Sequence, residues 1–300
     1  MELKKIQRVL IVGAGTMGRQ IGFQCAAHGY DVVIYDNDKE VLETAIEKIK
    51  NYFNDLAKSN LIESEMQSKI LEKIEISNEY TDAGKEADLL SESIFEDPNI
   101  KGETLSEFNK VCPSHTIFTT NTSSLLPSQY AAETGRPSRF AALHFHNPVW
   151  YANVVDIMPH AGTDPEIIDH LQEFALSINQ TPICLRRENR GYIFNTILDA
   201  INRSALRLAA NDVASIQDID RSWMGITKMN VGPFGIMDNI GIDLIYHIMK
   251  DSLDQKQLSF IQTYIENGWF GRKSNRGFYV YPNPQFSSHD FIKKRLDNGD

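Results

Sequence analysis

Two short apolar runs near the start of the chain are separated by a glycine-rich bend and a helical segment. Apart from a polar first residue, residues 8–12 and 31–35 are all aliphatic or aromatic. Continuous apolar runs of this length are typical of strands buried on both faces of a parallel sheet. Because residues 15–28 between them favour a helix, the chain is predicted to begin as strand, helix, strand with a parallel crossover.

Residues 38–74 carry a longer helical pattern than an ordinary crossover needs. Apolar side chains keep helical spacing up to Leu56, and the same spacing resumes from Ile62 to Ile74. The break between the two stretches falls near residues 58–60. The pattern therefore predicts a helical hairpin inserted between the second and third strands.

Apolar runs and helical segments continue to alternate until about residue 188. This order is typical of an α/β fold with a Rossmann-type, doubly wound sheet. A helix is predicted between the fourth and fifth strands, at residues 98–110. The further strands are predicted at residues 74–77, 88–93, 116–119, 140–144, 154–158 and 182–185.

The pattern changes after about residue 190. Residues 194–208 form one apolar helical stripe, and nearly all of the chain up to residue 267 has helical character. We predict a Rossmann-type domain at residues 1–188 and an all-α C-terminal domain at residues 189–300. Within the second domain, residues 282–300 are expected to form a polar tail.

The composition is that of a folded protein with small-molecule partners. A length of 300 residues with 42% hydrophobic side chains suits about two domains. The 40 acidic and 30 basic side chains give a formal net charge of -10, which disfavours nucleic acid as a partner. The first apolar run is too short for a signal peptide or a membrane span, so we expect a cytoplasmic protein without a membrane partner.

The cysteines suggest neither a disulfide framework nor a zinc site. Cys25, Cys112 and Cys184 lie far apart, form an odd set and show no C-x-x-C spacing. The sequence therefore predicts a reducing compartment and no metal.

The glycine-rich bend after the first strand fits the G-x-G-x-x-G fingerprint of dinucleotide-binding folds. Gly13 would make the turn, Gly15 would let the backbone approach a pyrophosphate, and Gly18 would let helix and strand pack closely. Thr16 and Met17 complete the segment at the start of the helix. A purely structural bend between a strand and a helix is the alternative interpretation.

Asp36 ends the second predicted strand, where a carboxylate can accept hydrogen bonds from both hydroxyls of a ribose. A carboxylate here would repel a 2′-phosphate, and no arginine lies just downstream to bind one. The sequence therefore favours NAD over NADP. The alternative is that Asp36 is only a turn residue.

Two polar segments follow predicted strands and so belong at the carboxyl edge of the sheet, where open α/β folds bind ligands. Residues 120–124 offer hydroxyls that can steady a substrate oxygen, or that merely cap the loop backbone. His144 and His146 end another strand, and we expect them to point to opposite faces, so that only one enters the cleft. Asp156, on the next strand, can fix the tautomer of the catalytic histidine or simply cap a strand end.

Imidazole suits the chemistry of alcohol oxidation. Removing a proton from an alcohol while hydride leaves needs a base with a pKa near neutrality. A lone histidine is, however, more often structural than catalytic, and that alternative applies to His144 as well.

Several separated motifs, in the same order along the chain, resemble those of the 3-hydroxyacyl-CoA dehydrogenase family. Together they span nearly the whole sequence. Residues 13–18 match its dinucleotide fingerprint, residues 121–125 its N-T-S-S-L segment, residues 144–148 its H-F-F-N-P segment, residues 191–195 the G-F-x-x-N-R that opens its helical domain, and residues 232–243 and 271–279 its later motifs.

The resemblance implies roles for individual residues. It implies that His144 is the general acid/base, that Asp156 takes the place of its orienting glutamate, and that Ser123 and Asn195 hydrogen-bond the reacting oxygen. It also implies that the C-terminal helices close the cleft and form a homodimer interface. The cofactor-side residues, from the fingerprint and the resemblance together, are Gly13, Gly15, Thr16, Met17, Gly18, Asp36, Glu96, Lys101, Asn121, Ser123 and Asn147.

Four positions depart from the family pattern. Asp156 is one methylene shorter than the usual glutamate, so its contact with His144 needs a closer strand or a water. His146 stands where phenylalanine is usual, and Thr196 where arginine is usual. The hairpin turn is rich in lysine in the family, but here Lys58 stands alone, which leaves little charge for the phosphates of coenzyme A.

The resemblance implies an NAD-dependent L-3-hydroxyacyl-CoA dehydrogenase of fatty acid metabolism. It would reversibly oxidise a 3-hydroxyacyl thioester, such as 3-hydroxybutyryl, to the 3-ketoacyl form. Residues 125–128 and 149–152 look closer to family members that act on diketones or sugar acids. A small 3-hydroxy acid or β-diketone without coenzyme A is therefore the alternative substrate. The alternative of another class is a catalytically idle, NAD-binding structural protein.

Overall fold

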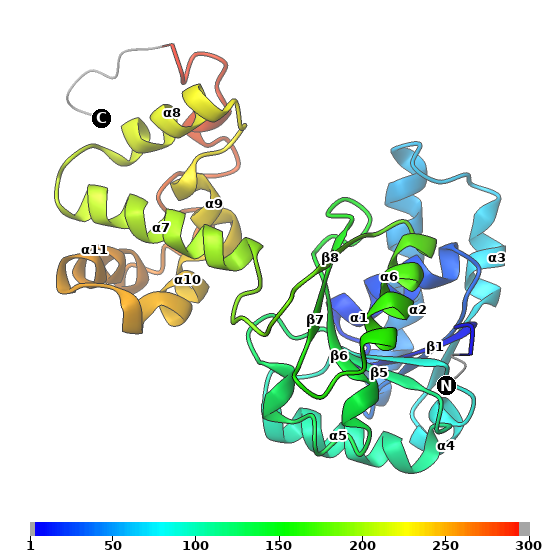
Figure 1. Ribbon diagram of the computed structural model, residues 1–300. Helices are drawn as coiled ribbons and strands as arrows, with labels where there is room; N and C mark the ends of the chain where they lie inside the picture. The colour runs from blue at the N-terminus through cyan, green and yellow to red at the C-terminus, as the bar shows by residue number, and fades with distance from the viewer. Residues whose placement is uncertain (1–3, 294–300) are drawn as a thin grey trace. The chain divides into compact units, whose positions relative to one another are not determined.

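The computed structural model describes residues 4–293 of the chain. It divides into two compact units, one ending at Tyr192 and the other beginning at Ile193 (Figure 1). The first unit is a sheet with helices on both faces, and the second is built from helices. An α/β unit followed by an α-helical unit is the fold class that the sequence predicts.

The first unit contains a single sheet of eight strands in the order β3-β2-β1-β4-β5-β6-β7-β8. The strand order reverses at β1, where the chain crosses from β3 to β4, and such a reversal creates a crevice at the carboxyl ends of β1 and β4. Neighbouring strands are parallel except β6 and β7, which are antiparallel. The strands are β1 (Arg8–Val12), β2 (Asp31–Tyr35), β3 (Ile74–Ser77), β4 (Leu89–Glu92), β5 (Ile117–Thr120), β6 (Phe140–Phe145), β7 (Val154–Pro159) and β8 (Thr181–Cys184).

Side chains of β1 alternate between two cores because successive residues of a strand point to opposite faces. Val9 and Ile11 belong to one cluster, and Leu10 and Val12 belong to the other. The first cluster also includes buried residues of α1, α2, α3 and α6, and the second includes residues of α4 and α5. The helices are α1 (Thr16–Ala27), α2 (Lys39–Lys58), α3 (Met66–Glu72), α4 (Tyr80–Gly84), α5 (Pro98–Val111) and α6 (Pro165–Ser177).

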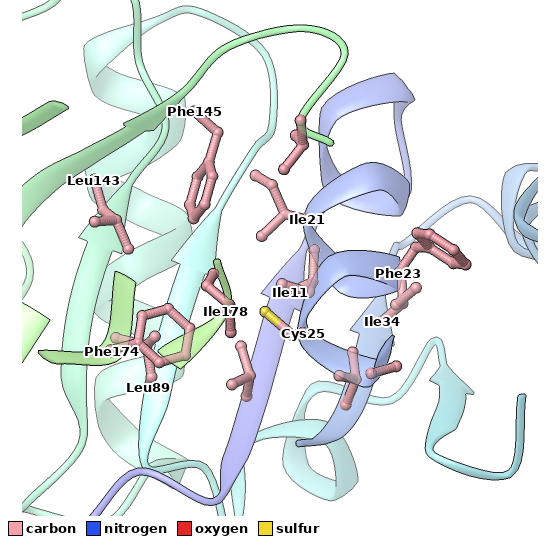
Figure 2. Packing of buried hydrophobic residues seen from close by; sticks show 14 of the residues in the cluster. Ile11, Ile21, Phe23, Cys25, Ile34, Leu89, Leu143, Phe145, Phe174 and Ile178 are labelled. Atoms are coloured by element: carbon pink, nitrogen blue, oxygen red, sulfur yellow. The ribbon is translucent and has the colours of Figure 1, made fainter. Parts of the chain in front are cut away.

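The larger core holds α1 against the start of the sheet. Figure 2 shows Ile21 and Cys25 of α1 beside Ile11 of β1, with Phe174 and Ile178 packed nearby. All five side chains are at most 3% exposed. Full burial of an aliphatic or aromatic side chain contributes about 1.5–3 kcal/mol. This packing fixes the start of α1 relative to the end of β1, where the glycine-rich bend lies.

The helical hairpin predicted at residues 38–74 is formed by α2 and α3. Asp38 caps α2, because its side chain accepts hydrogen bonds from the backbone N–H groups of Glu40 and Val41. The turn follows Lys58, and Asn60 adopts a left-handed conformation there with φ of 55°. Leu56 and Ile70 anchor the hairpin to the larger core.

The second unit packs its helices around one apolar cluster that includes Phe234, Ile245 and Phe278. Two buried carboxylates join its parts: Asp220 accepts the N–H groups at the start of α9, and Asp238 accepts those of Phe278 and Tyr279. Its helices are α7 (Phe194–Ala210), α8 (Ile216–Thr227), α9 (Pro233–Ile240), α10 (Ile242–Met249) and α11 (Gln255–Glu266). Among the described residues, no helix is long and apolar enough to cross a membrane.

The expectation of a polar tail from residue 282 is wrong for its first part. The ring of Phe286 packs on that of Tyr279 at 4.9 Å between centroids, and Phe291 is only 5% exposed, beside the guanidinium of Arg221. These scattered aromatic residues lack the periodicity that identifies a buried element in a sequence. Residues 294–300 lie outside the described part of the chain.

Candidate active site

The glycine-rich bend has the shape of a phosphate cradle. Gly13 has φ of +106°, and a Cβ atom there would lie 2.6 Å from the carbonyl oxygen of Ser93. A Cβ atom on Gly18 would lie 1.8 Å from the carbonyl oxygen of Gly13, so only glycine allows α1 to approach β1 this closely. A Cβ atom on Gly15 would meet nothing within 4 Å. The bend is therefore tightly packed on the side of Gly13 and Gly18 and open at the start of α1, where Thr16 and Met17 form the first turn. Phosphates commonly bind at such a helix start.

Asp36 is tied to this bend. One carboxylate oxygen accepts a hydrogen bond of 2.8 Å from the backbone N–H of Ala14, and the other accepts one of 3.0 Å from the N–H of Asp38. The carboxylate thus lies directly beside the cradle at the end of β2. A carboxylate has about four acceptor positions, so two remain for the hydroxyls of a ribose.

A buried ion pair lies at the carboxyl end of β4. Lys101 is 1% exposed, and its Nζ lies 2.6 Å from Oε1 of Glu92 and 3.3 Å from Oε2 of Glu96. Glu92, which is fully buried at the end of β4, also accepts hydrogen bonds from the Thr120 hydroxyl and the Ile94 N–H. Lys101 is therefore directed at two carboxylates, which makes it a support for Glu96. The sequence analysis did not single out Glu92, although an acidic residue at the end of a predicted buried strand is a usable signal.

Glu96 organises the loop after β5. Its Oε1 accepts hydrogen bonds from the Thr122 hydroxyl, from the Ser123 N–H at 3.2 Å, and from the Ser124 N–H and hydroxyl at 3.1 and 2.9 Å. Burial raises the pKa of Glu96, but the bonds from Thr122 and Ser124 and the charge of Lys101 outweigh burial and hold this pKa below its usual value. An ionised Glu96 thus fixes the backbone that presents Ser123.

His144 and Asp156 face each other across the antiparallel pair β6 and β7. They are register partners, and Nδ1 of His144 lies 3.3 Å from Oδ2 of Asp156. The shorter aspartate therefore reaches His144 directly, without a water between them. Asn121 fixes the end of β6 from the other side, because its Oδ1 accepts the backbone N–H of Phe145 at 2.7 Å.

His146 joins the same carboxylate. Its Nε2 lies 3.0 Å from Oδ2 of Asp156, and its ring centroid is 4.6 Å from that of His144. The expectation that the two histidines point to opposite faces is therefore wrong. Residues two apart in a strand share a face, because side chains alternate with a period of two.

Burial and the carboxylate act on the His144 imidazole in opposite directions. Burial lowers the pKa of His144, Asp156 raises it and His146 lowers it, with a net result below the usual value. Burial raises the pKa of Asp156, but hydrogen bonds from both histidines outweigh burial and lower this pKa to about 2. The pair therefore consists of a neutral imidazole and an ionised carboxylate at neutral pH. Since Nδ1 faces Asp156, Nε2 is the atom left for proton transfer.

Tyr192 completes the surroundings of the imidazole. Its ring stacks on His144 with 4.5 Å between centroids and an angle of 23°, and its hydroxyl donates to the carbonyl oxygen of Thr122. Tyr192 lies far from His144 in sequence, so no local pattern could have identified this contact. The ring covers one side of the imidazole and links it to the loop that carries Ser123.

Asn147 connects α1 to the segment that follows β6. Its Oδ1 accepts a hydrogen bond of 2.8 Å from Nε2 of Gln20, and Oε1 of Gln20 accepts the N–H of Val149 at 3.0 Å. Asn147 is thus held against the helix whose start forms the cradle. Gln20, which makes this connection, was not singled out from the sequence.

The first unit therefore gathers Gly13, Gly15, Gly18, Asp36 and the histidine pair with their supports, whereas Asn195 belongs to the second unit. Asn195 lies in the first turn of α7 and is partly exposed. Its contact with the reacting oxygen stays a prediction.

His144, His146 and Asp156 offer three ligand atoms within 4.8 Å of one another and could in principle hold a metal ion. We interpret them as a hydrogen-bonded group, because both imidazoles lie at hydrogen-bonding distance from one carboxylate oxygen.

Comparison with known proteins assigns both units. Residues 8–188 match the profile of the NAD-binding domain of 3-hydroxyacyl-CoA dehydrogenase, and residues 191–281 match that of its C-terminal domain. A probable 3-hydroxyacyl-CoA dehydrogenase of Caenorhabditis elegans is 30% identical, with 93% of this chain and 94% of the relative covered. The human mitochondrial hydroxyacyl-coenzyme A dehydrogenase is also 30% identical, with 92% and 91% covered.

Solved structures show the same architecture with different substrates in their descriptions. A diketoreductase described as acting on dicarbonyl compounds superposes with a TM-score of 0.86 at 33% identity, covering 93% of this chain and 100% of the other. The (S)-3-hydroxybutyryl-CoA dehydrogenase of Ralstonia eutropha superposes with a TM-score of 0.85 at 26% identity, with the same coverage.

Proposed function

Because the chain belongs to the 3-hydroxyacyl-CoA dehydrogenase family and is an NAD-binding oxidoreductase, we propose that it oxidises the alcohol at carbon 3 of an L-3-hydroxyacyl thioester. The reverse reaction would reduce the 3-ketoacyl form. The observation that carries the proposal is the pair of His144 and Asp156, buried between β6 and β7 beside the loop that presents Ser123. This pair provides a neutral imidazole backed by a fixed negative charge.

The cofactor fits the residues of the first unit. The open side of Gly15 and the start of α1 would hold the pyrophosphate, and Asp36 would hold a ribose. When bound, NAD supplies the acceptor or donor of the hydride. Asn147, fixed to α1 through Gln20, would help to place cofactor and substrate on this side of the crevice.

His144 would act as the general acid/base. Nε2 would accept the proton of the substrate hydroxyl as the alcohol becomes a ketone, and Asp156 would stabilise the imidazolium that forms. Ser123 and Asn195 would hydrogen-bond the reacting oxygen and oppose the charge that develops there. Glu96 would keep Ser123 in place, with Asn121 fixing the end of β6 and Lys101 fixing Glu96.

A second candidate keeps this chemistry and changes the substrate to a free 3-hydroxy acid or β-diketone. The specific observation in its favour is the hairpin turn, where Lys58 is the only lysine and lies 3.6 Å from the carboxylate of Asp55. A single exposed lysine offers little positive charge to the phosphates of coenzyme A. The likeness to a diketoreductase structure supports the same candidate.

The test is a comparison of turnover by the purified full-length chain. With NADH, acetoacetyl-CoA should be reduced faster than acetoacetate or a simple β-diketone, and the reverse order would favour the second candidate. The His144→Gln variant should lose about two to four orders of magnitude in kcat while NADH still binds. A catalytically idle protein would bind NADH and reduce none of these compounds. Full activity of the variant would contradict the assignment of His144.

The second unit also presents an apolar groove of about 850 Å³ between α7 and α8. Ile197, Val213 and Ile226 line it and are 57%, 66% and 79% exposed. Exposed apolar patches of this kind mark protein interfaces. We propose that a second copy of the chain covers the groove, because the match to the family's C-terminal domain includes α7 and α8 and the apolar stripe of α7 lines the groove.

A further inference from the structure

One oxygen of Asp156 serves two imidazoles. Nε2 of His146 lies 3.0 Å from Oδ2, whereas Nδ1 of His144 lies 3.3 Å from the same atom. Hydrogen bonds weaken as the distance between donor and acceptor grows, so His146 has the shorter contact with the shared charge. The side chain of His146 is 19% exposed and that of His144 is 7% exposed. The more exposed ring therefore has the shorter contact with the carboxylate.

We propose that His146 is a positioning residue that competes with His144 for the Asp156 carboxylate and thereby lowers the proton affinity of the catalytic imidazole. The inference rests on the proposed function, in which His144 is the base. Its consequence is that alcohol oxidation stays possible at lower pH, because a base works only while it is unprotonated.

With Asp156 ionised, the neutral forms of both rings donate an N–H to Oδ2, which leaves Nε2 of His144 free to accept a proton. The imidazolium form of His144 is stabilised by the Asp156 carboxylate. This stabilisation is weaker when the same oxygen already accepts a hydrogen bond from His146. If His146 itself carries a second proton, the two like charges repel across 4.6 Å between ring centroids. Both effects oppose protonation of His144.

Other groups around His144 also act on its protonation. Asp156 on β7 attracts the protonated form, Glu96 attracts it more weakly, and the neutral ring of Tyr192 stacks on one side. Burial itself disfavours the charged ring. Of the charged groups, Asp156 is the one that His146 also contacts, so a variant at position 146 acts on His144 through this carboxylate and through the loss of the neighbouring ring.

Two variants separate the hydrogen bond from the ring. His146→Phe keeps a flat ring and removes the donor, whereas His146→Gln keeps an N–H donor and cannot acquire a positive charge. His160→Phe is the control, because His160 contacts Phe140 at the opposite end of β6 and the carbonyl oxygen of Pro137. All variants remain full-length, and circular dichroism checks their folding.

The readout is the titration midpoint of the His144 Cε1–H signal in NMR, assigned through His144→Gln and recorded with EDTA present. In His146→Phe the midpoint should rise by about one pH unit. In His146→Gln it should rise by less, and in His160→Phe it should stay unchanged. If the midpoint in His146→Phe is unchanged or falls, the proposal is overturned. If that variant fails to fold, an unchanged midpoint in His146→Gln overturns it.

The pH dependence of kcat/KM for oxidation distinguishes this inference from the function it rests on. The acid limb of the profile should move to higher pH by the same amount as the NMR midpoint. A midpoint that moves while the acid limb stays in place would support the role of His146 and overturn His144 as the base. A wild-type midpoint that depends on EDTA would overturn the proposal, because the three side chains would then hold a metal ion.

Discussion

The carboxylate of Asp36 accepts a hydrogen bond of 2.8 Å from the backbone N–H of Ala14, within the glycine-rich bend. A residue at the end of β2 is thereby locked to the loop that follows β1. The contact links the carboxylate proposed to bind a ribose to the bend proposed to bind a pyrophosphate, so that a dinucleotide bound there would meet both at a fixed separation.

Replacing Asp36 with alanine should weaken NADH binding by about 10- to 100-fold, because hydrogen bonds to a charged group contribute about 1.5–3 kcal/mol. The preference for NADH over NADPH should fall as well, since the repulsion of a 2′-phosphate disappears. Fluorescence titration with both cofactors measures the two effects.

The matched control for that experiment is Asp38→Ala. Asp38 caps α2 through its side chain, so its loss should lower the free energy of unfolding by about 1 kcal/mol and leave NADH affinity unchanged. Equal losses of NADH affinity in both variants would show that Asp36 acts only on the fold of the loop.

Gly18 and Gly15 should respond differently to alanine. At Gly18 the new methyl group would lie 1.8 Å from the carbonyl oxygen of Gly13, so α1 must move and the free energy of unfolding should fall by about 1–3 kcal/mol. At Gly15 the methyl group enters open space, so the fold should be kept while NADH binding weakens. Urea unfolding combined with NADH titration separates the two cases, and unchanged NADH affinity in Gly15→Ala would argue against the cradle.

Much of this could be predicted from the sequence because the signals are local. Strands β1 and β2 are short apolar runs after a polar first residue, and the glycine spacing and Asp36 lie within one strand-helix-strand unit. The hairpin is equally visible, because α2 and α3 each carry their own helical period. Strand positions agree to within one or two residues at their ends, where boundaries are least sharply defined.

Apart from Asp156, which the sequence already pairs with His144, the surroundings of His144 could not be predicted because they depend on contacts between distant segments. The antiparallel register of β6 and β7, which brings Asp156 opposite His144, is not encoded in either strand alone. The stacking of Tyr192 and the role of Glu92 arise in the same way. The error on His146 differs in kind, because the period of a strand already places His144 and His146 on one face.

Asp238 should make the stability of the helical unit depend on pH. Burial raises its pKa to about 6, from an ordinary value of 3.8, although the N–H groups of Phe278 and Tyr279 and the hydroxyl of Tyr281 oppose the shift. A carboxyl whose folded pKa is raised destabilises the fold most fully above that pKa. The cost is relieved as the pH falls through 6 toward 3.8, so this group should stabilise the unit on acidification from pH 7 to pH 5.

The Asp238→Asn variant tests this linkage. It should be less stable at every pH by about 1–3 kcal/mol, because the amide cannot accept from both backbone N–H groups as the carboxylate does. Since asparagine does not titrate, the gap between wild type and variant should widen from pH 7 to pH 5. Urea unfolding in a Trp150→Phe background, where Trp223 and Trp269 of the second unit report, measures the gap. A gap that narrows on acidification would contradict the sign of the shift.

Dimer formation should depend on the apolar groove between α7 and α8. Ile226 is 79% exposed and lines the groove, so Ile226→Glu should place a charge in the proposed interface between two copies. The dissociation constant of the dimer should rise by about 30-fold or more, because burial of an unpaired charge at the centre of an interface costs at least 2 kcal/mol. Leu61→Glu, on an apolar residue of the first unit that is 58% exposed in the hairpin turn, is the control and should leave assembly unchanged. Analytical ultracentrifugation over a range of concentrations measures both. If Ile226→Glu sediments as the wild type does, or if the wild type is a monomer throughout, a second copy does not cover this groove.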